Sequence, residues 1–239
     1  EEKKAIILAH YYVDEEVQKI ADYIGDSFYL AKVASQTDAD RIVFAGVEFM
    51  GESAKILNPE KKVFMPDAFA DCPMAHMITI KEIKEMKEKY EDLAVVCYIN
   101  STAEIKQYAD VCVTSSNAVK IVKALPQKNI FFIPDQNLGD FVRKQVPEKN
   151  VMTNYGHCPR HTNITLDKLN EAKQKYPEAK IAVHPECKRE IVEAADFVGS
   201  TSAIIDYVVQ TNAKDFIIGT VDGVFAKIKE LAPNKNLHT

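Results

Sequence analysis

The chain has 239 residues, a formal net charge of −5 at pH 7 and a hydrophobic fraction of 46%. Acidic and basic residues are interspersed, which excludes the basic surface that nucleic-acid binding requires, and no apolar run reaches membrane-spanning length. Five cysteines outside a small secreted scaffold indicate a reducing compartment in which thiols serve a site. The chain opens at Glu1 without a methionine and stops at Thr239, so we expect both ends to be incomplete.

One unit of about 87 residues recurs three times along the chain. The copies share an apolar first strand, a turn rich in Ser and Thr, a second apolar strand and a Pro-Glu-Lys or Pro-Asn-Lys turn, within residues 5–60, 93–148 and 179–234. Nearly constant spacing of four landmarks is hard to obtain by chance, and each copy is too small to be comfortably stable alone. The sequence therefore predicts three packed domains, at residues 1–78, 79–164 and 165–239.

Each copy opens with a continuous apolar run, which is typical of a strand buried on both faces of a parallel sheet. These first strands are predicted at residues 6–9, 93–97 and 181–183. A helix follows each of them, at residues 14–23, 102–108 and 187–194, with Asp14 and Ser101 as suitable N-caps. A link containing Asp and the turn rich in Ser and Thr then lead into a second helix.

The second half of each copy continues the alternation of strands and helices. A second strand, followed by a third helix, is predicted at residues 42–44, 130–133 and 216–218. A last strand is predicted in the first two copies, at residues 62–65 and 151–153, and helices at 80–90 and 166–176 join the copies. This order predicts an α/β fold of three Rossmann-like α-β-α domains, each with a small parallel sheet. We expect a pseudo-threefold axis with the active site at its centre.

Polar side chains follow all three first strands, and ligands of open parallel sheets bind at the carboxyl ends of the strands. They are His10, Tyr11 and Tyr12, then Tyr98 and Asn100, and finally His184 and Glu186. A single histidine at a strand end is more often a structural residue with satisfied hydrogen bonds. Because the equivalent ends are polar in three domains, we expect these side chains to converge on one pocket.

Hydroxyl residues mark the start of the second helix in each copy. They are Ser27, Ser115 and the pair Ser200 and Thr201. Each can serve simply as a helix cap. Free N–H groups, hydroxyls and the positive end of a helix also bind phosphate or carboxylate, so three such ends facing one pocket would hold a small polyanion.

Two cysteines lie at the repeat interval. Cys72 and Cys158, each followed by proline, are 86 residues apart, and a third copy would fall beyond Thr239, at about position 244. Three thiolates, one from each domain, suit an iron–sulfur cluster that leaves one iron open as a Lewis acid. The alternative is that both cysteines are ordinary buried residues.

The other three cysteines receive a structural interpretation. Cys97 and Cys112 lie inside apolar strands, and we predict that they belong to the core. Cys187 directly follows the third strand-end segment, and we interpret it as structural as well.

Seven motifs, taken together, are highly specific. They are Leu8-Ala-His-Tyr-Tyr12, Gly25-Asp-Ser27, the segment 44–55, Tyr98-Ile-Asn-Ser-Thr102, Thr114-Ser-Ser-Asn-Ala118, His184-Pro-Glu186 and Gly199-Ser-Thr201. With them the chain resembles the quinolinate synthase family over essentially its whole length. The resemblance implies the triplicated α-β-α fold and a [4Fe–4S] cluster held by one cysteine from each domain, here Cys72, Cys158 and a third cysteine beyond Thr239.

The resemblance also implies an activity in the cytoplasm. The family's reaction is the condensation of iminoaspartate with dihydroxyacetone phosphate to quinolinate, with loss of phosphate and water, as a transferase step of NAD biosynthesis. The implied partners are these two small molecules and, through coupling of activities, L-aspartate oxidase. Neither nucleic acid nor membrane is expected as a partner.

Site residues follow from the resemblance position by position. The implied catalytic residues are Glu186, His184, His10, Tyr98 and Tyr12. The implied substrate-binding residues are His10, Ser27, Tyr98, Asn100, Ser115, His184, Glu186, Ser200 and Thr201. Many family members carry Asn in place of Tyr11, so the resemblance assigns that residue no role.

Two other classes of function compete with this interpretation. One is another enzyme on a threefold, three-cysteine plan, such as the terminal reductase of the non-mevalonate isoprenoid route or a diphthamide-type radical enzyme. The other is a non-catalytic protein that binds anions or stores metal. A requirement for an electron donor or S-adenosylmethionine would favour the first, and ligand binding without product would favour the second.

Overall fold

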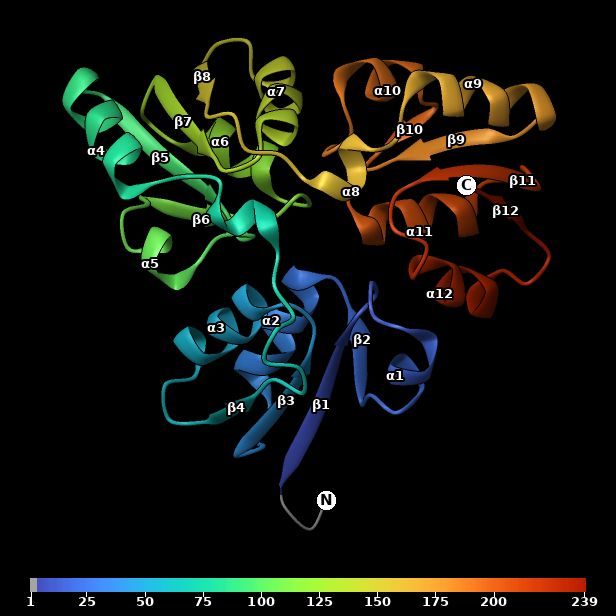
Figure 1. The fold of residues 1–239 in the computed structure, drawn as a ribbon, viewed down its shortest axis with the longest axis horizontal. Coiled ribbons are helices and arrows are strands. Elements are labelled where there is room, and N and C mark those ends of the chain that lie inside the picture. Colours follow the sequence, from blue (N-terminus) through green and yellow to red (C-terminus); the bar gives the residue numbers. More distant parts are fainter. Residues whose placement is uncertain (1–3) are drawn as a thin grey trace.

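The computed structural model describes residues 4–239, and these form three four-stranded sheets in which every strand pairing is parallel. The strand orders are β2-β1-β3-β4, β6-β5-β7-β8 and β10-β9-β11-β12, which are the same order written three times. Figure 1 shows three lobes, one for each sheet, arranged around a common centre. The predicted α/β class and its three Rossmann-like units are therefore confirmed.

The first unit has the strands β1 (Ala5–His10), β2 (Tyr23–Gly25), β3 (Arg41–Ala45) and β4 (Lys62–Phe64). Its helices are α1 (Glu15–Lys19), α2 (Ser27–Gln36) and α3 (Glu48–Leu57). A short 3₁₀ helix, η1 (Pro73–His76), and then α4 (Ile80–Lys89) lead into the second unit. A full capping box between Thr79 and Glu82 fixes the start of α4.

The second unit has the strands β5 (Leu93–Tyr98), β6 (Val111–Val113), β7 (Asn129–Ile133) and β8 (Asn150–Thr153). Its helices are α5 (Ala103–Lys106), α6 (Ala118–Ala124) and α7 (Gln136–Gln145), and α8 (Pro159–Thr162) and α9 (Leu166–Lys175) follow. The third unit has the strands β9 (Lys180–Val183), β10 (Phe197–Val198), β11 (Asp215–Gly219) and β12 (Asn236–His238). Its helices are α10 (Arg189–Ala194), α11 (Thr201–Gln210) and α12 (Val224–Leu231).

Strand β5 illustrates why the first strands are apolar throughout. Ala94 and Val96 pack into a cluster that includes Val122 of α6 and Leu138 of α7. The alternate residues of β5 face a second cluster on the opposite side, which α4 and α5 supply. Successive side chains of a strand point to opposite faces, so a central parallel strand covered by helices on both sides needs apolar residues at every position.

Two polar ties recur in all three units and explain two of the landmarks in the sequence. A linking aspartate accepts a hydrogen bond from a backbone N–H of the first strand: Asp22 from Ile7, Asp110 from Val95 and Asp196 from Ile181. A lysine after the third helix donates to two carbonyls at the end of the second helix: Lys61, Lys149 and Lys235. These ties fasten the crossover connections to the sheets.

The predicted order of elements left out one strand in every unit, although it placed Cys112 inside an apolar strand. Strands β2, β6 and β10 have only two or three residues each and follow directly after the linking aspartate. They pair with the first strand in register, Leu8 with Tyr23 in the first unit. Strand β12 also forms in the third unit, where no last strand was expected, because Phe216 of β11 pairs with Leu237.

Some local predictions were wrong in detail. Thr102, and not Ser101, caps α5 by accepting a hydrogen bond from the N–H of Ile105. Asp14 makes no side-chain hydrogen bond to the start of α1, which ends at Lys19 rather than at residue 23. Cys112 is exposed and does not belong to the core, because β6 lies at the edge of its sheet. Within residues 4–239, no helix is long and apolar enough to cross a membrane.

We predict that Lys149→Met lowers the free energy of unfolding by about 1–3 kcal/mol, the usual contribution of hydrogen bonds to a charged group. Methionine keeps most of the length of the side chain but cannot donate to the carbonyls of Leu125 and Gln127. Urea denaturation measures the change. Lys123→Met, at an exposed position of α6, should change stability by less than about 0.5 kcal/mol. An equal loss in both variants would contradict the role of this tie.

Candidate active site and metal centre

The carboxyl ends of the three first strands meet at the centre of the molecule. Strands β1, β5 and β9 all run inward in Figure 1. A cavity of about 700 Å³ lies at this junction and takes side chains from all three units. A volume of this size suits small-molecule ligands.

The predicted site residues gather at this cavity with one exception. Its lining includes His10, Tyr12, Ser27, Tyr98, Asn100, Ser115, His184, Glu186, Thr201, Cys72 and Cys158. Ser200 does not line the cavity: it is the N-cap of α11, and its hydroxyl accepts a hydrogen bond from the N–H of Ala203. Tyr11 packs instead against the core of the third unit.

The two strand-end histidines are buried. Their side chains lie where three domains exclude water, so burial lowers the pKa of His10 to about 4 and that of His184 to about 3. Both imidazoles are therefore neutral at pH 7 and can accept a hydrogen bond. In each, Nδ1 already accepts from the backbone N–H two residues later, that of Tyr12 or of Glu186. The repeated contact orients both rings in the same way.

Glu186 is a buried carboxylate surrounded by hydrogen-bond donors. Burial alone would raise the pKa of Glu186, but the electrostatic influence of the His161 and His184 imidazoles, with hydrogen bonds from His161 and Tyr98, holds this pKa well below its usual range. Its Oε2 atom lies 2.7 Å from Nδ1 of His161 and 3.7 Å from Nδ1 of His184. Glu186 is thus an ionised carboxylate in an enclosed cavity, held by the donors around it.

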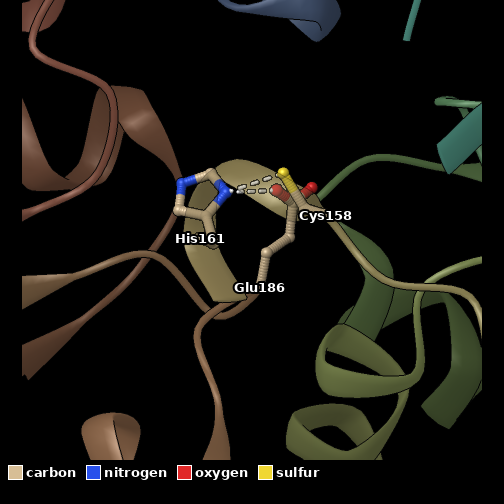
Figure 2. A group of neighbouring side chains, drawn as sticks. All are labelled: Cys158, His161 and Glu186. Atoms are coloured by element: carbon tan, nitrogen blue, oxygen red, sulfur yellow. Dashed lines mark hydrogen bonds and ion pairs between the residues drawn. The ribbon is translucent and has the colours of Figure 1, made fainter. Parts of the chain in front are cut away.

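Cys158, His161 and Glu186 form a compact cluster. Figure 2 shows the imidazole of His161 pointing at both the thiol and the carboxylate. Nδ1 of His161 lies 3.1 Å from Sγ of Cys158, and the three ligand atoms all lie within 4.8 Å of one another. Thiolate, imidazole and carboxylate are all metal ligands, so this group could hold a metal ion.

Sequence reasoning missed His161. It lies three residues after Cys158, and the first unit has Ala75 at the equivalent position, so comparison of the repeats gave no signal there. The spacing of Cys158 and His161 on one short helix, α8, was the available clue.

A chain of hydroxyl groups connects His161 to Tyr12. Nε2 of His161 lies 3.0 Å from the hydroxyl of Thr220, which lies 3.0 Å from the hydroxyl of Tyr12. The Tyr12 hydroxyl in turn lies 2.9 Å from that of Thr201. Tyr12 comes from the first unit and both threonines come from the third, so the chain links two units through groups that can pass a proton.

The two cysteine loops are anchored alike. The carbonyl of Ala70 accepts a 2.8 Å hydrogen bond from the N–H of Glu48, and the carbonyl of Gly156 accepts a 2.8 Å bond from Gln136. Each bond ties a cysteine loop to the start of the third helix of its own unit. The thiols of both loops line the same cavity, so the donor set fits a metal group at the centre.

Asp135 adds a further support in the second unit, which sequence reasoning also missed. One carboxylate oxygen accepts hydrogen bonds from the N–H groups of Asn137 and Leu138, and the other accepts from that of Cys158. The group is buried, and burial, followed by the charge of Glu186, raises its pKa well above the usual range.

Burial also raises the pKa of the Cys72 and Cys158 thiols, that of Cys72 to about 11. A thiolate here would therefore need a cation to balance its charge.

The three helix ends differ from one another. In the first unit the N-cap is the carboxylate of Asp26, which accepts from the N–H of Tyr29 and from the hydroxyl of Ser202. In the second unit Ser115 lies in a turn before α6, which begins at Ala118. The expected set of three equivalent anion sites is thus reduced, because a carboxylate occupies one helix end and the Ser200 hydroxyl another.

The comparisons with known proteins agree with this geometry. The family model described as "Quinolinate synthetase A protein" matches residues 1–239. A quinolinate synthase of Fusobacterium nucleatum is 61% identical over 237 residues, which cover 99% of this chain and 79% of that protein. One of Caldicellulosiruptor saccharolyticus is 52% identical over 237 residues, covering 99% and 78%, and one of Aquifex aeolicus is 54% identical over 234 residues, covering 98% and 73%. The chain therefore belongs to the quinolinate synthetase A protein family, whose members are enzymes.

Proposed function

We propose that this enzyme condenses iminoaspartate with dihydroxyacetone phosphate to form quinolinate, releasing phosphate and water, as a step of NAD biosynthesis. The observation that carries the proposal is the convergence of His10, Tyr98 and Glu186 with two equivalent cysteines on one cavity. A dehydrating condensation needs a buried base, groups that carry protons and an electrophilic centre, and these side chains supply the first two. A cytoplasmic location and coupling to L-aspartate oxidase belong to the same proposal.

The cofactor we propose is a [4Fe–4S] cluster. Cys72 and Cys158 would hold it together with a third cysteine beyond Thr239, as the equal anchoring of their loops supports. When bound, the open iron supplies Lewis-acid chemistry to substrate oxygen atoms. His161 and Glu186 lie within 4.8 Å of Cys158, so they would border a cluster held by that thiolate.

Glu186 acts as the general base in this proposal. Its carboxylate is ionised, is shielded from bulk water and accepts a hydrogen bond from Tyr98. Nδ1 of His161 lies 2.7 Å from the Glu186 carboxylate and Nε2 lies 3.0 Å from the hydroxyl of Thr220, so the ring connects the base to Thr220 as a path for protons. The relay ends at Tyr12, whose hydroxyl can return the proton to a leaving oxygen.

The remaining residues bind and orient the substrates. The neutral imidazoles of His10 and His184 and the amide of Asn100 offer hydrogen bonds without adding negative charge. Ser27, Ser115 and Thr201 present hydroxyls to the same cavity and would hold carboxylate or phosphate oxygens. Ser200 supports Thr201 from the N-cap position of α11.

The metal proposal predicts that Cys158→Ser, made in the full-length protein, loses both bound iron and activity. Serine retains the size of the side chain but lacks the thiolate that iron–sulfur clusters require. Iron and acid-labile sulfide are measured after anaerobic purification. Cys187→Ser is the matched control, because this buried thiol contacts the carbonyl of Gly219 and lies outside the cavity lining. Undiminished iron and turnover in Cys158→Ser would sink the proposal.

The relay predicts a graded loss of turnover. Glu186→Gln should lower kcat by about 10²–10⁴-fold, the usual effect of removing a general base, with a much smaller effect on KM. Thr220→Val should lower kcat by about tenfold, which is equivalent to about 1.4 kcal/mol, because valine breaks the link between His161 and Tyr12. Thr220→Ser keeps the hydroxyl and should restore turnover. Equal activity of the valine and serine variants would exclude the relay.

The buried histidines predict that acid destabilises the fold. Below pH 6.5 an unfolded chain protonates His10 and His184, whereas the folded chain resists until about pH 4 and about pH 3. Above pH 6.5 both states hold these histidines neutral, so their contribution to the free energy of unfolding is at its maximum. Below pH 6.5 this contribution falls by up to about 1.4 kcal/mol per pH unit for each histidine. Urea denaturation between pH 6.5 and 5 should show a shallower slope for His10→Gln. An unchanged slope in His10→Gln would refute the assignment.

A further inference from the structure

Two cysteines outside the cavity lie beside each other in the second unit. Cys97 near the end of β5 and Cys112 in the middle of β6 are register partners on adjacent parallel strands. Register partners project from the same face of a sheet, and neighbouring strands lie about 4.8 Å apart, a spacing within the range of disulfide-bonded residues. The two thiols are close enough for each to change the pKa of the other.

The same register position is apolar in the other two units. Ala9 faces Ile24 in the first sheet, and Val183 faces Val198 in the third. The fold therefore does not need sulfur at this position. The two thiols in register in the second unit are therefore present for a reason other than the stability of the fold.

The two thiols differ in their surroundings. Cys97 is fully buried, whereas Cys112 is exposed on an edge strand of three residues. The partly buried ammonium of Lys106 acts electrostatically on both sulfur atoms. The neighbouring Cys97 thiol, followed by the charge of Lys106, lowers the pKa of Cys112, while the pKa of Cys97 is raised. An exposed thiolate beside a buried thiol is the arrangement of an attacking and a resolving cysteine.

We propose that Cys97 and Cys112 form a redox-active dithiol site that reacts with low-molecular-weight disulfides. The Cys112 thiolate attacks one sulfur of the small disulfide, forms a mixed disulfide and expels one thiolate. Cys97 then loses its proton and attacks the Cys112 sulfur, which forms the Cys97–Cys112 bond and expels the second thiolate. Two protein thiols are oxidised while the small disulfide is reduced to two thiols.

Oxidation at this site bears on the active site through the backbone. The thiol of Cys97 donates a 3.4 Å hydrogen bond to the carbonyl of Tyr98, and the hydroxyl of Ser101 donates a 3.0 Å bond to the same atom. A disulfide removes the first of these donors. Tyr98 hydrogen-bonds Glu186, so oxidation should lower turnover, a consequence that rests on the proposed function, whereas the dithiol itself does not.

The test uses oxidised glutathione with the full-length, anaerobically purified protein. After acid quenching and alkylation, trypsin places Cys97 in the peptide 90–106 and Cys112 in the peptide 107–120, each with one cysteine. We expect a disulfide-linked pair of these peptides, which dithiothreitol separates. Cys97→Ser should instead accumulate glutathione on Cys112, and Cys112→Ser should yield neither product.

Two further measurements test the role of Lys106 and the effect of oxidation on turnover. Lys106→Gln should slow alkylation of Cys112 at pH 7, because the thiolate fraction falls. Oxidised wild type should lose activity that Cys112→Ser retains under the same treatment. Absence of the linked peptides, or equal alkylation of Cys112 with and without Lys106, would overturn the dithiol site. Linked peptides with unchanged activity would uphold the dithiol and refute only its effect on Tyr98.

Discussion

The buried carboxylate of Glu186 is the interaction on which the site depends. An ionised group in an enclosed cavity is costly unless donors surround it, and here the donors come from different parts of the chain. Tyr98 belongs to the second unit and His161 to the short helix α8, whereas Glu186 itself lies in the third unit. The charge is therefore stable only when the units are packed together. Packing of the units and stabilisation of the Glu186 charge therefore depend on the same contacts.

The contacts that support the fold repeat in all three units, whereas the residues that line the cavity differ from unit to unit. The linking aspartates and the lysines after the third helices recur in all three units because every crossover connection meets the same geometric problem. The cavity walls do not repeat in this way. Asp26, Ser115 and Ser200 occupy related helix starts and offer a carboxylate, a free hydroxyl and an engaged hydroxyl.

Features that the repeats share could be predicted from the sequence. The continuous apolar runs indicated central parallel strands, and the interval between Cys72 and Cys158 indicated that their loops are equivalent. The convergence of His10, Tyr98 and His184 followed from the rule that ligands bind at the carboxyl ends of parallel strands. In these cases one physical cause acts three times, so the sequence carries the signal three times.

Features unique to one unit could not be predicted in the same way. Thr220 and Asp135 reach the site through contacts that only the packing of separate segments creates, with His161 and Cys158 respectively. The strand β6 was missed because three residues are too few to show a period. The exposure of Cys112 follows from its place on that edge strand. Composition alone gives an edge and a core cysteine the same appearance.

The pseudo-threefold arrangement has a consequence for ligand orientation. A cavity with three identical walls would accept a small anion in three equivalent poses, and two of them would hold the reacting atoms away from the base. Here one wall carries Glu186, another carries Asn100 and the third carries a carboxylate, Asp26, at its helix end. The three orientations of a bound anion are therefore not equivalent. The charge and hydrogen-bonding pattern of the walls favours one of them.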